Sequence, residues 1–102
     1  MISRIWHGWT SKANADAYQK LLTSRILPGI HRVAGYKGAY LLRRDAGAEV
    51  EFVTITMFGS MEAVHAFAGD DYEVAVVPPE ARALLSHFDE RSKHYDAVMG
   101  PS

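Results

Sequence analysis

The sequence predicts an α+β fold of the ferredoxin-like kind, in which helices cover one face of an antiparallel sheet. Its 102 residues suit a single domain spanning residues 1–102, because two separate cores would each be too small. Segments with period-two alternation are interspersed with segments of helical spacing, in the order strand, helix, strand, strand, helices, strand. This order is the βαββαβ pattern of ferredoxin-like domains.

The first strand is expected over residues 2–9, where β-branched, aromatic and small side chains predominate. Alternation places two sets of side chains on opposite faces of this strand: Ile5, His7 and Trp9 on one, and Arg4, Trp6 and Gly8 on the other. Thr10 and Ser11 offer capping oxygens to a helix expected over residues 13–27. Pro28 should kink or end this helix, because proline disfavours helical backbone at the residue before it.

A β-hairpin is expected from residues 36–44 and 49–58, joined by a short turn sequence. Ser60 then predicts the N-cap of a short helix. Another helix is expected to start at Pro78-Pro79, with a buried stripe formed by Ala81, Leu84, Leu85 and Phe88. A last strand is expected over residues 91–98, whereas the apolar run over residues 74–77 is too short to indicate a strand.

Composition excludes several classes of partner and site. Eleven basic residues are scattered among 12 acidic ones, for a net charge of -1, so neither nucleic acid nor an anionic membrane is an expected partner. No apolar run approaches the roughly 20 residues that span a bilayer. The absence of cysteine removes thiolate chemistry and fits a cytoplasmic location. The five histidines lack the spacing of a zinc site, so no metal is expected.

The strand over residues 49–58 is apolar on both faces, with Val53, Ile55 and Met57 on one side and Phe52, Thr54, Thr56 and Phe58 on the other. Helices can cover only one of these faces. A second copy of the chain is the simplest cover for the other, which predicts a homodimer. The alternative is that the chain's own tail or loops cover it.

Four segments resemble the antibiotic biosynthesis monooxygenase superfamily: Trp9-Thr10 at the end of the first strand, Pro28-Gly29 after the long helix, the Gly35-Tyr36-Lys37-Gly38 start of the second strand, and the passage from Phe58 to Ala63. The resemblance covers nearly the whole chain. It implies a dimeric α+β barrel in which each subunit holds a ligand pocket between its own helices and sheet.

The heme-degrading branch of this family uses an asparagine, a tryptophan and an iron-binding histidine. The resemblance places His7, Phe67 and Val77 at these three positions, so all three differ. Valine has no lone pair for iron, and heme binding would therefore need His65 or another histidine.

The resemblance implies a small monooxygenase that acts on an aromatic or polyketide-like compound without a cofactor. His7 is the candidate base, since an imidazole titrates near neutral pH and the family alignment directs it into the pocket. Trp9, Phe67 and Tyr72 are the candidate substrate-binding residues. Ordinary packing is the alternative role of Trp9 and Phe67, and a surface position that of Tyr72. Two other functions stay open: heme degradation with altered ligation, and a non-catalytic ligand-binding or stress-responsive dimer.

Overall fold

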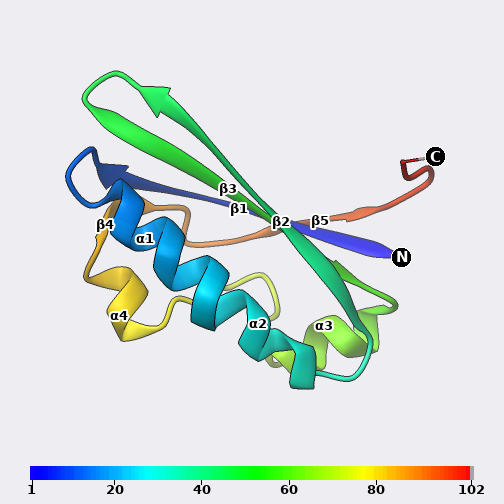
Figure 1. The fold of residues 1–102 in the computed structure, drawn as a ribbon. Helices are drawn as coiled ribbons and strands as arrows, with labels where there is room; N and C mark the ends of the chain where they lie inside the picture. Colours follow the sequence, from blue (N-terminus) through cyan, green and yellow to red (C-terminus); the bar gives the residue numbers. More distant parts are fainter. Residues whose placement is uncertain (102) are drawn as a thin grey trace.

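Strand β1 (Ile2–Ser11) lies inside a five-stranded antiparallel sheet, which the computed structural model describes within residues 1–101 (Figure 1). On one side it pairs along its whole length with β3 (Glu49–Phe58), which forms a hairpin with β2 (Tyr36–Ala46). On its other side, β4 (Leu85–Phe88) and β5 (Lys93–Asp96) share one edge, each along a different half of β1. The predicted α+β ferredoxin-like class is confirmed.

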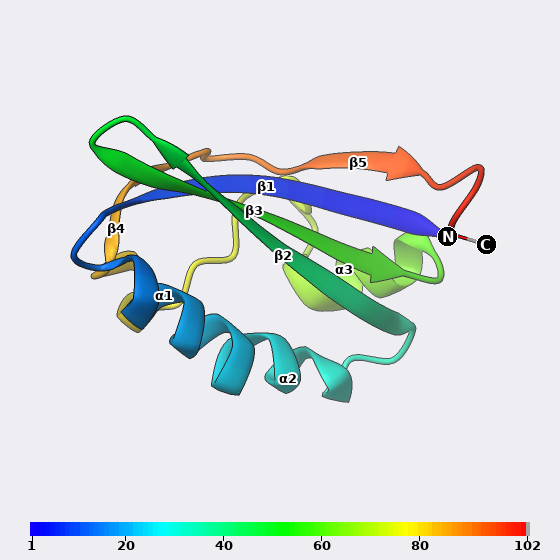
Figure 2. The ribbon, with the colours of Figure 1, turned by 45° about the horizontal axis from the view of Figure 1, so that its top comes forward.

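A long helical segment follows β1 and lies across one face of the sheet (Figure 2). It consists of α1 (Ala15–Leu21), a π-helical turn (Leu22–Ile26), α2 (Leu27–Gly29) and a 3₁₀ turn (Ile30–Arg32). The sequence predicts a kink or an end at Pro28, and in the structure the helix does not end there, because the backbone stays helical from Leu27 to Arg32. Proline has no N–H and crowds the carbonyl four residues earlier, which here belongs to Ser24 inside the π turn, where the wider backbone leaves more room.

Helix α3 (Met61–Ala68) begins as predicted, because the Ser60 hydroxyl accepts a hydrogen bond from the Ala63 N–H at 3.2 Å. The prediction for the next helix is wrong beyond its first turn. Helix α4 spans only Pro79–Arg82, and Leu85 and Phe88, expected on its buried stripe, belong to β4. The open backbone edge of β1 offers hydrogen bonds that local helical spacing does not reveal.

The core lies between the helices and the sheet, in two clusters. The larger contains Ala15, Tyr18, Leu22, Val50, Phe52 and Ala81, and the smaller contains Ile30, Phe58, Ala63 and Val64. Within residues 1–101, no helix has the length and apolar character required to cross a membrane. The opposite face of the sheet, called the open face below, carries no helix (Figure 2).

Candidate functional site

A cavity opens between the helices and the helix-side face of the sheet. Most of its wall is apolar, formed by Trp6, Leu22, Ile26, Leu27, Ile30, Phe67, Val76, Val77, Pro78 and Ala81. Five residues add polar groups: Arg4, Tyr18, Thr54, Thr56 and Ser92. An apolar cavity with a few converging polar groups is the usual form of a small-molecule site.

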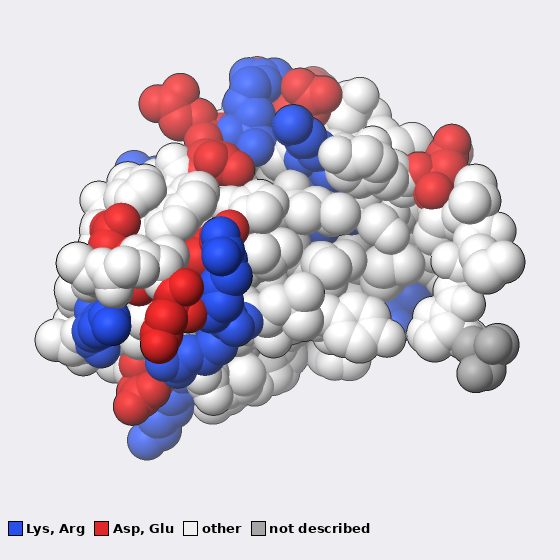
Figure 3. All heavy atoms as spheres, turned by 90° about the horizontal axis from the view of Figure 1, so that it is seen from above, with Lys and Arg blue, Asp and Glu red and all other residues white. Residues whose placement is uncertain are grey.

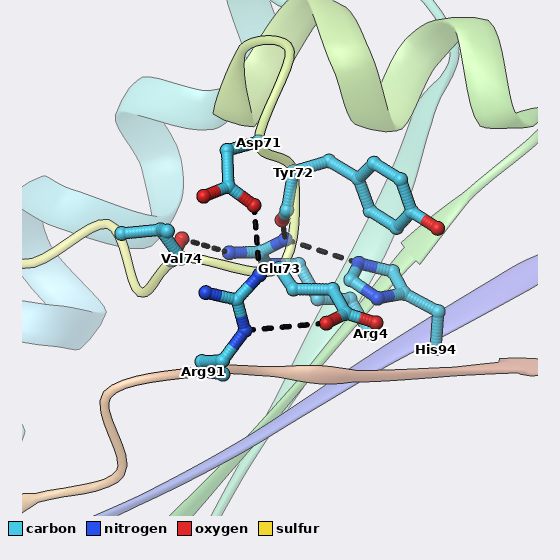
Figure 4. Close-up of polar contacts among 7 residues, drawn as sticks. All are labelled: Arg4, Asp71, Tyr72, Glu73, Val74, Arg91 and His94. Atoms are coloured by element: carbon cyan, nitrogen blue, oxygen red, sulfur yellow. Dashed lines mark hydrogen bonds and ion pairs between the residues drawn. The ribbon is translucent and has the colours of Figure 1, made fainter.

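Arg4 is the charged group of this wall. It stands on β1 among side chains that face the core, and only 4% of it is exposed. Its Nη1 donates to the Tyr72 carbonyl and contacts His94 Nε2 at 3.0 Å, and its Nη2 donates to the Val74 carbonyl at 3.0 Å (Figure 4). The guanidinium carbon also lies 5.5 Å from the ring centre of Phe67. These contacts hold the cation against the cavity wall.

Arg4 takes part in no ion pair among the described residues. Asp71 and Glu73, on the neighbouring loop, both pair with Arg91 instead, at 2.7 and 3.2 Å (Figure 4). Burial lowers the pKa of Arg4 to about 10, which leaves the side chain positively charged at neutral pH. Arg4 is therefore a buried cation that backbone carbonyls solvate without neutralising.

His94 is held in its neutral form beside Arg4. Arginine is only a donor, so Nε2 of His94 must be the acceptor in their contact. Burial lowers the pKa of His94, and the charge of Arg4 lowers it further. The other nitrogen, Nδ1, is buried and has no hydrogen-bond partner among residues 1–101.

Two hydroxyls of the cavity wall lack partners. Thr54 Oγ1 on β3 and Ser92 Oγ just before β5 are buried, and neither makes a hydrogen bond within residues 1–101. Thr56 differs, since its hydroxyl donates to the Arg4 carbonyl at 3.4 Å. The cavity wall that contains the buried cation thus also contains two hydroxyl groups without partners among the described residues.

The structure divides the four residues predicted from the sequence into two pairs on opposite sides of the sheet. Phe67 lines the cavity. Tyr72 lies next to it in the smaller core cluster, with its ring 5.0 Å from that of His94. His7 and Trp9 lie together on the open face, with ring centres 6.1 Å apart.

The expected direction of His7 into the pocket is wrong. His7 pairs across β3 with Val53, and successive strand residues alternate faces, so the core-facing positions of β1 belong to Arg4, Gly8 and Thr10. His7 Nδ1 contacts Glu51 Oε2 at 2.7 Å, and Arg44 Nε donates to Glu51 Oε1 at 2.8 Å. The hydrogen bond from His7, followed by that from Arg44, lowers the pKa of Glu51.

Trp9 also misses the cavity. Its ring stacks on that of His87 at 4.6 Å and 8°. The tryptophan that does line the cavity is Trp6, whose Nε1 donates to the Asp89 carbonyl at 2.6 Å.

The main polar residues of the cavity, Arg4, Thr54 and Ser92, were not candidates on sequence grounds. One signal was available: alternation places Arg4 on the same strand face as Trp6 and Gly8. A charged side chain on the face that turns out to pack against helices is unusual and marks a site. Ser92 and His94 carried no such signal, because they reach Arg4 only through the folding of the last strand along β1.

The residues around the cavity do not fit heme. Val77, at the expected iron-binding position, lines the wall and has no lone pair. His94 uses its Nε2 lone pair for Arg4, and His65 packs against Tyr72 outside the wall. Burial raises the pKa of Tyr18 and disfavours the phenolate that would bind iron. Within residues 1–101, no group of three or more histidines and carboxylates could hold a metal ion.

No protein-family model matches the sequence, and no curated protein does either. Solved structures, however, match the fold. A Deinococcus radiodurans protein, provisionally assigned as an antibiotic biosynthesis monooxygenase, superimposes with a TM-score of 0.69 over 100% of this chain and 97% of that one, at 13% identity. The chain has the fold of the antibiotic biosynthesis monooxygenase superfamily.

Two further structures with the antibiotic biosynthesis monooxygenase fold carry ligands. The heme-degrader MhuD of Mycobacterium tuberculosis, solved with two hemes in its active site, has a TM-score of 0.63 and 18% identity, with 100% of both chains covered. A Streptomyces coelicolor monooxygenase in complex with nanaomycin D has a TM-score of 0.58 and 18% identity, covering 99% of this chain and 92% of that one. At such identities the likeness establishes the fold.

Proposed function

We propose that this chain is a small monooxygenase that oxidises an aromatic or polyketide-like compound in the cavity between its helices and sheet, without a bound cofactor. The observation that supports it is the cavity wall, where the rings of Trp6, Tyr18 and Phe67 stand among aliphatic side chains. Flat aromatic compounds gain both apolar burial and ring contacts on such a wall. A monooxygenase of the same fold binds nanaomycin D, which agrees with a polyketide-like substrate.

The reaction needs no external reductant if the substrate is an anthrone-like compound. Its ring CH₂ group becomes a carbonyl, and the four electrons released reduce one molecule of dioxygen. One oxygen atom enters the product, and the other leaves as water with the two hydrogens of the CH₂ group. A dry apolar cavity favours this chemistry because it excludes competing reactions with water.

We also propose that two copies of the chain pair through their open faces. Register places Ile5, Ile55 and Tyr40 side by side at the centre of this face, with Val53, Leu42 and Met57 around them. Tyr40 and Leu42 are 53% and 48% exposed, which is costly for large apolar side chains in a group. Seen from above, the molecule carries its charged side chains mostly toward its edges, with a largely uncharged middle (Figure 3).

Oxygen uptake by the purified chain with a panel of anthrones and hydroquinones tests the proposed activity. We expect one O₂ consumed per quinone formed from an anthrone, and labelled ¹⁸O₂ should leave one labelled atom in the product. Phe67→Ala should raise KM about two- to tenfold, the loss expected for one aromatic contact. Arg32→Ala, an exposed substitution away from the cavity, is the control and should not change KM.

Three results would contradict the proposal. Uptake no faster than in buffer for every compound, together with ligand binding, would favour the non-catalytic dimer. A Soret shift at stoichiometric hemin would favour the heme alternative. His7→Ala belongs in the same series, because His7 is the base that the family resemblance implies. Loss of activity in that variant would place the reaction on the open face and not in this cavity.

A further inference from the structure

We propose that Arg4, with the hydroxyls of Thr54 and Ser92, forms a subsite for an anionic oxygen, so that the ligand of this cavity is an aromatic compound bearing a carboxylate or an ionised enol. This inference rests on the proposed function for the location of the ligand, and it names the chemical class of that ligand. The three groups belong to different elements: Arg4 to β1, Thr54 to β3, and Ser92 to the segment before β5. All three line the cavity.

The first argument is the charge balance of Arg4. A buried cation is costly unless it is paired and hydrogen-bonded, because burial removes its hydration. Arg4 is 4% exposed, and none of the ion pairs of residues 1–101 includes it. The nearby acidic residues Asp71 and Glu73 are engaged by Arg91. An anionic ligand would supply the missing countercharge.

The second argument is the donor count of the guanidinium. Arginine has five N–H groups, and the structure uses three of them, for the Tyr72 carbonyl, the Val74 carbonyl and His94 Nε2. The Nε–H and one Nη2–H have no partner within the described residues. The nitrogens Nε and Nη2 form one edge of the planar group, and arginine commonly binds two oxygens of a ligand through such an edge.

The third argument is the pair of unused hydroxyls. Ser92 is only 3% exposed, and its Oγ has no hydrogen-bond partner within residues 1–101, nor has Thr54 Oγ1. Buried polar atoms are nearly always satisfied, so such orphans indicate a missing partner. A hydroxyl donates to an anionic oxygen readily, and charged acceptors form the stronger hydrogen bonds. All three arguments therefore indicate a ligand with an anionic oxygen: the charge of Arg4, its free N–H groups, and the unpartnered hydroxyls of Thr54 and Ser92.

The rest of the wall determines what carries this group. Apolar and aromatic side chains surround the polar subsite, and no carboxylate lines the cavity within the described residues. Neutral aromatic compounds would bury their rings but leave Arg4 without a countercharge. A ligand that joins an aromatic body to one acidic oxygen satisfies both parts of the wall.

Matched pairs of probes test the subsite by titration calorimetry. Naphthoate is compared with its methyl ester, and hydroxynaphthoquinone, an acidic enol that is ionised at neutral pH, with its methoxy derivative. In the unmodified chain we expect each anion to bind at least about tenfold more tightly than its neutral partner, in keeping with a charge-assisted hydrogen bond. The tighter of the two anions identifies carboxylate or enolate as the preferred source of the oxygen.

Variants assign the preference to these residues. Arg4→Gln should abolish the preference for the anion, and Ser92→Ala should reduce it severalfold. Arg32→Gln makes the same change at an exposed arginine of the 3₁₀ turn and should leave it intact. Arg4→Lys keeps the charge but not the planar fork and should retain only part of the preference. If Arg4→Gln does not fold, Ser92→Ala and the unmodified chain still decide the question.

Equal affinity for anion and ester in the unmodified chain would overturn the inference, as would an unchanged preference in folded Arg4→Gln. The outcome is separable from the proposed function. Anion preference without oxygen uptake would leave the subsite standing and refute the monooxygenase. Oxygen uptake from neutral anthrones without anion preference would support the monooxygenase and refute the subsite.

Discussion

The imidazole of His94 illustrates how one contact fixes a protonation state. Its lone pair accepts from Arg4, and its ring packs against Tyr72. Within residues 1–101, Glu73 is the one acidic group that affects its pKa, and it favours the charged form weakly. Protonation would remove the acceptor and place two cations together. The folded protein therefore binds this proton less readily than the unfolded chain does.

This difference predicts a pH dependence of stability. The pKa of His94 is lowered below its ordinary value of 6.5. Well above that pH, His94 is neutral in both the folded and the unfolded protein and contributes nothing to the pH dependence of stability. As the pH falls below 6.5, the unfolded chain takes up the proton first, and the free energy of unfolding decreases. Urea unfolding at about pH 7.5 and about pH 5.5 should show this loss.

His94→Gln is the matched variant, because a glutamine oxygen can still accept from Arg4 and does not titrate. It should lose less stability over the same interval. An equal loss in both proteins would contradict the role of His94. The lowered pKa of Glu51 acts only at more acidic pH, below its ordinary value of 4.5, and does not interfere.

Two threonines of β3 give a second prediction at single positions. The buried hydroxyl of Thr54 has no partner in the described part of the chain, so Thr54→Val should raise the free energy of unfolding by about 1 kcal/mol. The Thr56 hydroxyl donates to the Arg4 carbonyl, so Thr56→Val should lower it by about 1 kcal/mol. Thermal and urea unfolding measure both.

If both threonine variants shift in the same direction, the assignment of satisfied and unsatisfied hydroxyls is wrong. Thr54→Val should also weaken naphthoate binding, because the unpartnered hydroxyl belongs to the proposed subsite. A gain in stability with a loss of binding is the usual sign of a polar group kept for function.

Among the elements, the junction between the long helical segment and β2 depends on Gly35. This residue has φ +88°, and a Cβ there would lie 2.6 Å from the Cβ of Ala63 in α3. Gly35→Ala should therefore cost about 2–4 kcal/mol through backbone strain and steric overlap. Gly29→Ala is the control, since Gly29 has helical backbone and open space around its Cβ position.

Gly29→Ala should be neutral or stabilise the protein by up to about 1 kcal/mol. Urea unfolding of both variants measures the contrast. Similar free energies of unfolding for Gly35→Ala and the unmodified chain would mean that α3 does not pack against this junction as the structure shows.

The C-terminal elements show the limit of local patterns. Leu84, Leu85 and Phe88 have helical spacing, yet Leu85 and Phe88 form β4 because β1 presents an edge with unpaired backbone groups. Strands β1 and β3, by contrast, were predictable, since both segments are rich in β-branched and aromatic residues, which favour strands. The secondary structure of a short segment near a sheet edge depends on whether the segment pairs with that edge.

For the whole molecule, the open face determines the state of association. Ile55 lies at its centre, between Ile5 and Tyr40 on the neighbouring strands. Ile55→Glu should convert the proposed dimer to a monomer, because a carboxylate would be buried without a partner. Ala17→Glu, on the exposed side of α1, introduces the same charge away from this face and should remain dimeric.

Sedimentation at micromolar concentration distinguishes these states. A monomeric unmodified chain, or a dimeric Ile55→Glu variant, would contradict pairing through the open face. Ligand binding in the cavity should survive in the monomer, since the residues that line it come from one chain.

Local periodicity was sufficient for the α+β class, the alternation along β1 and β3, and the start of α3 at Ser60, because these depend on residues a few positions apart. It could not show which face of the sheet the helices cover, and so directed His7 to the wrong side. Nor could it bring His94 to Arg4 across 90 positions of the sequence. Such contacts arise from packing between segments that are distant in the sequence, and the spacing of neighbouring residues does not reveal the free energy of that packing.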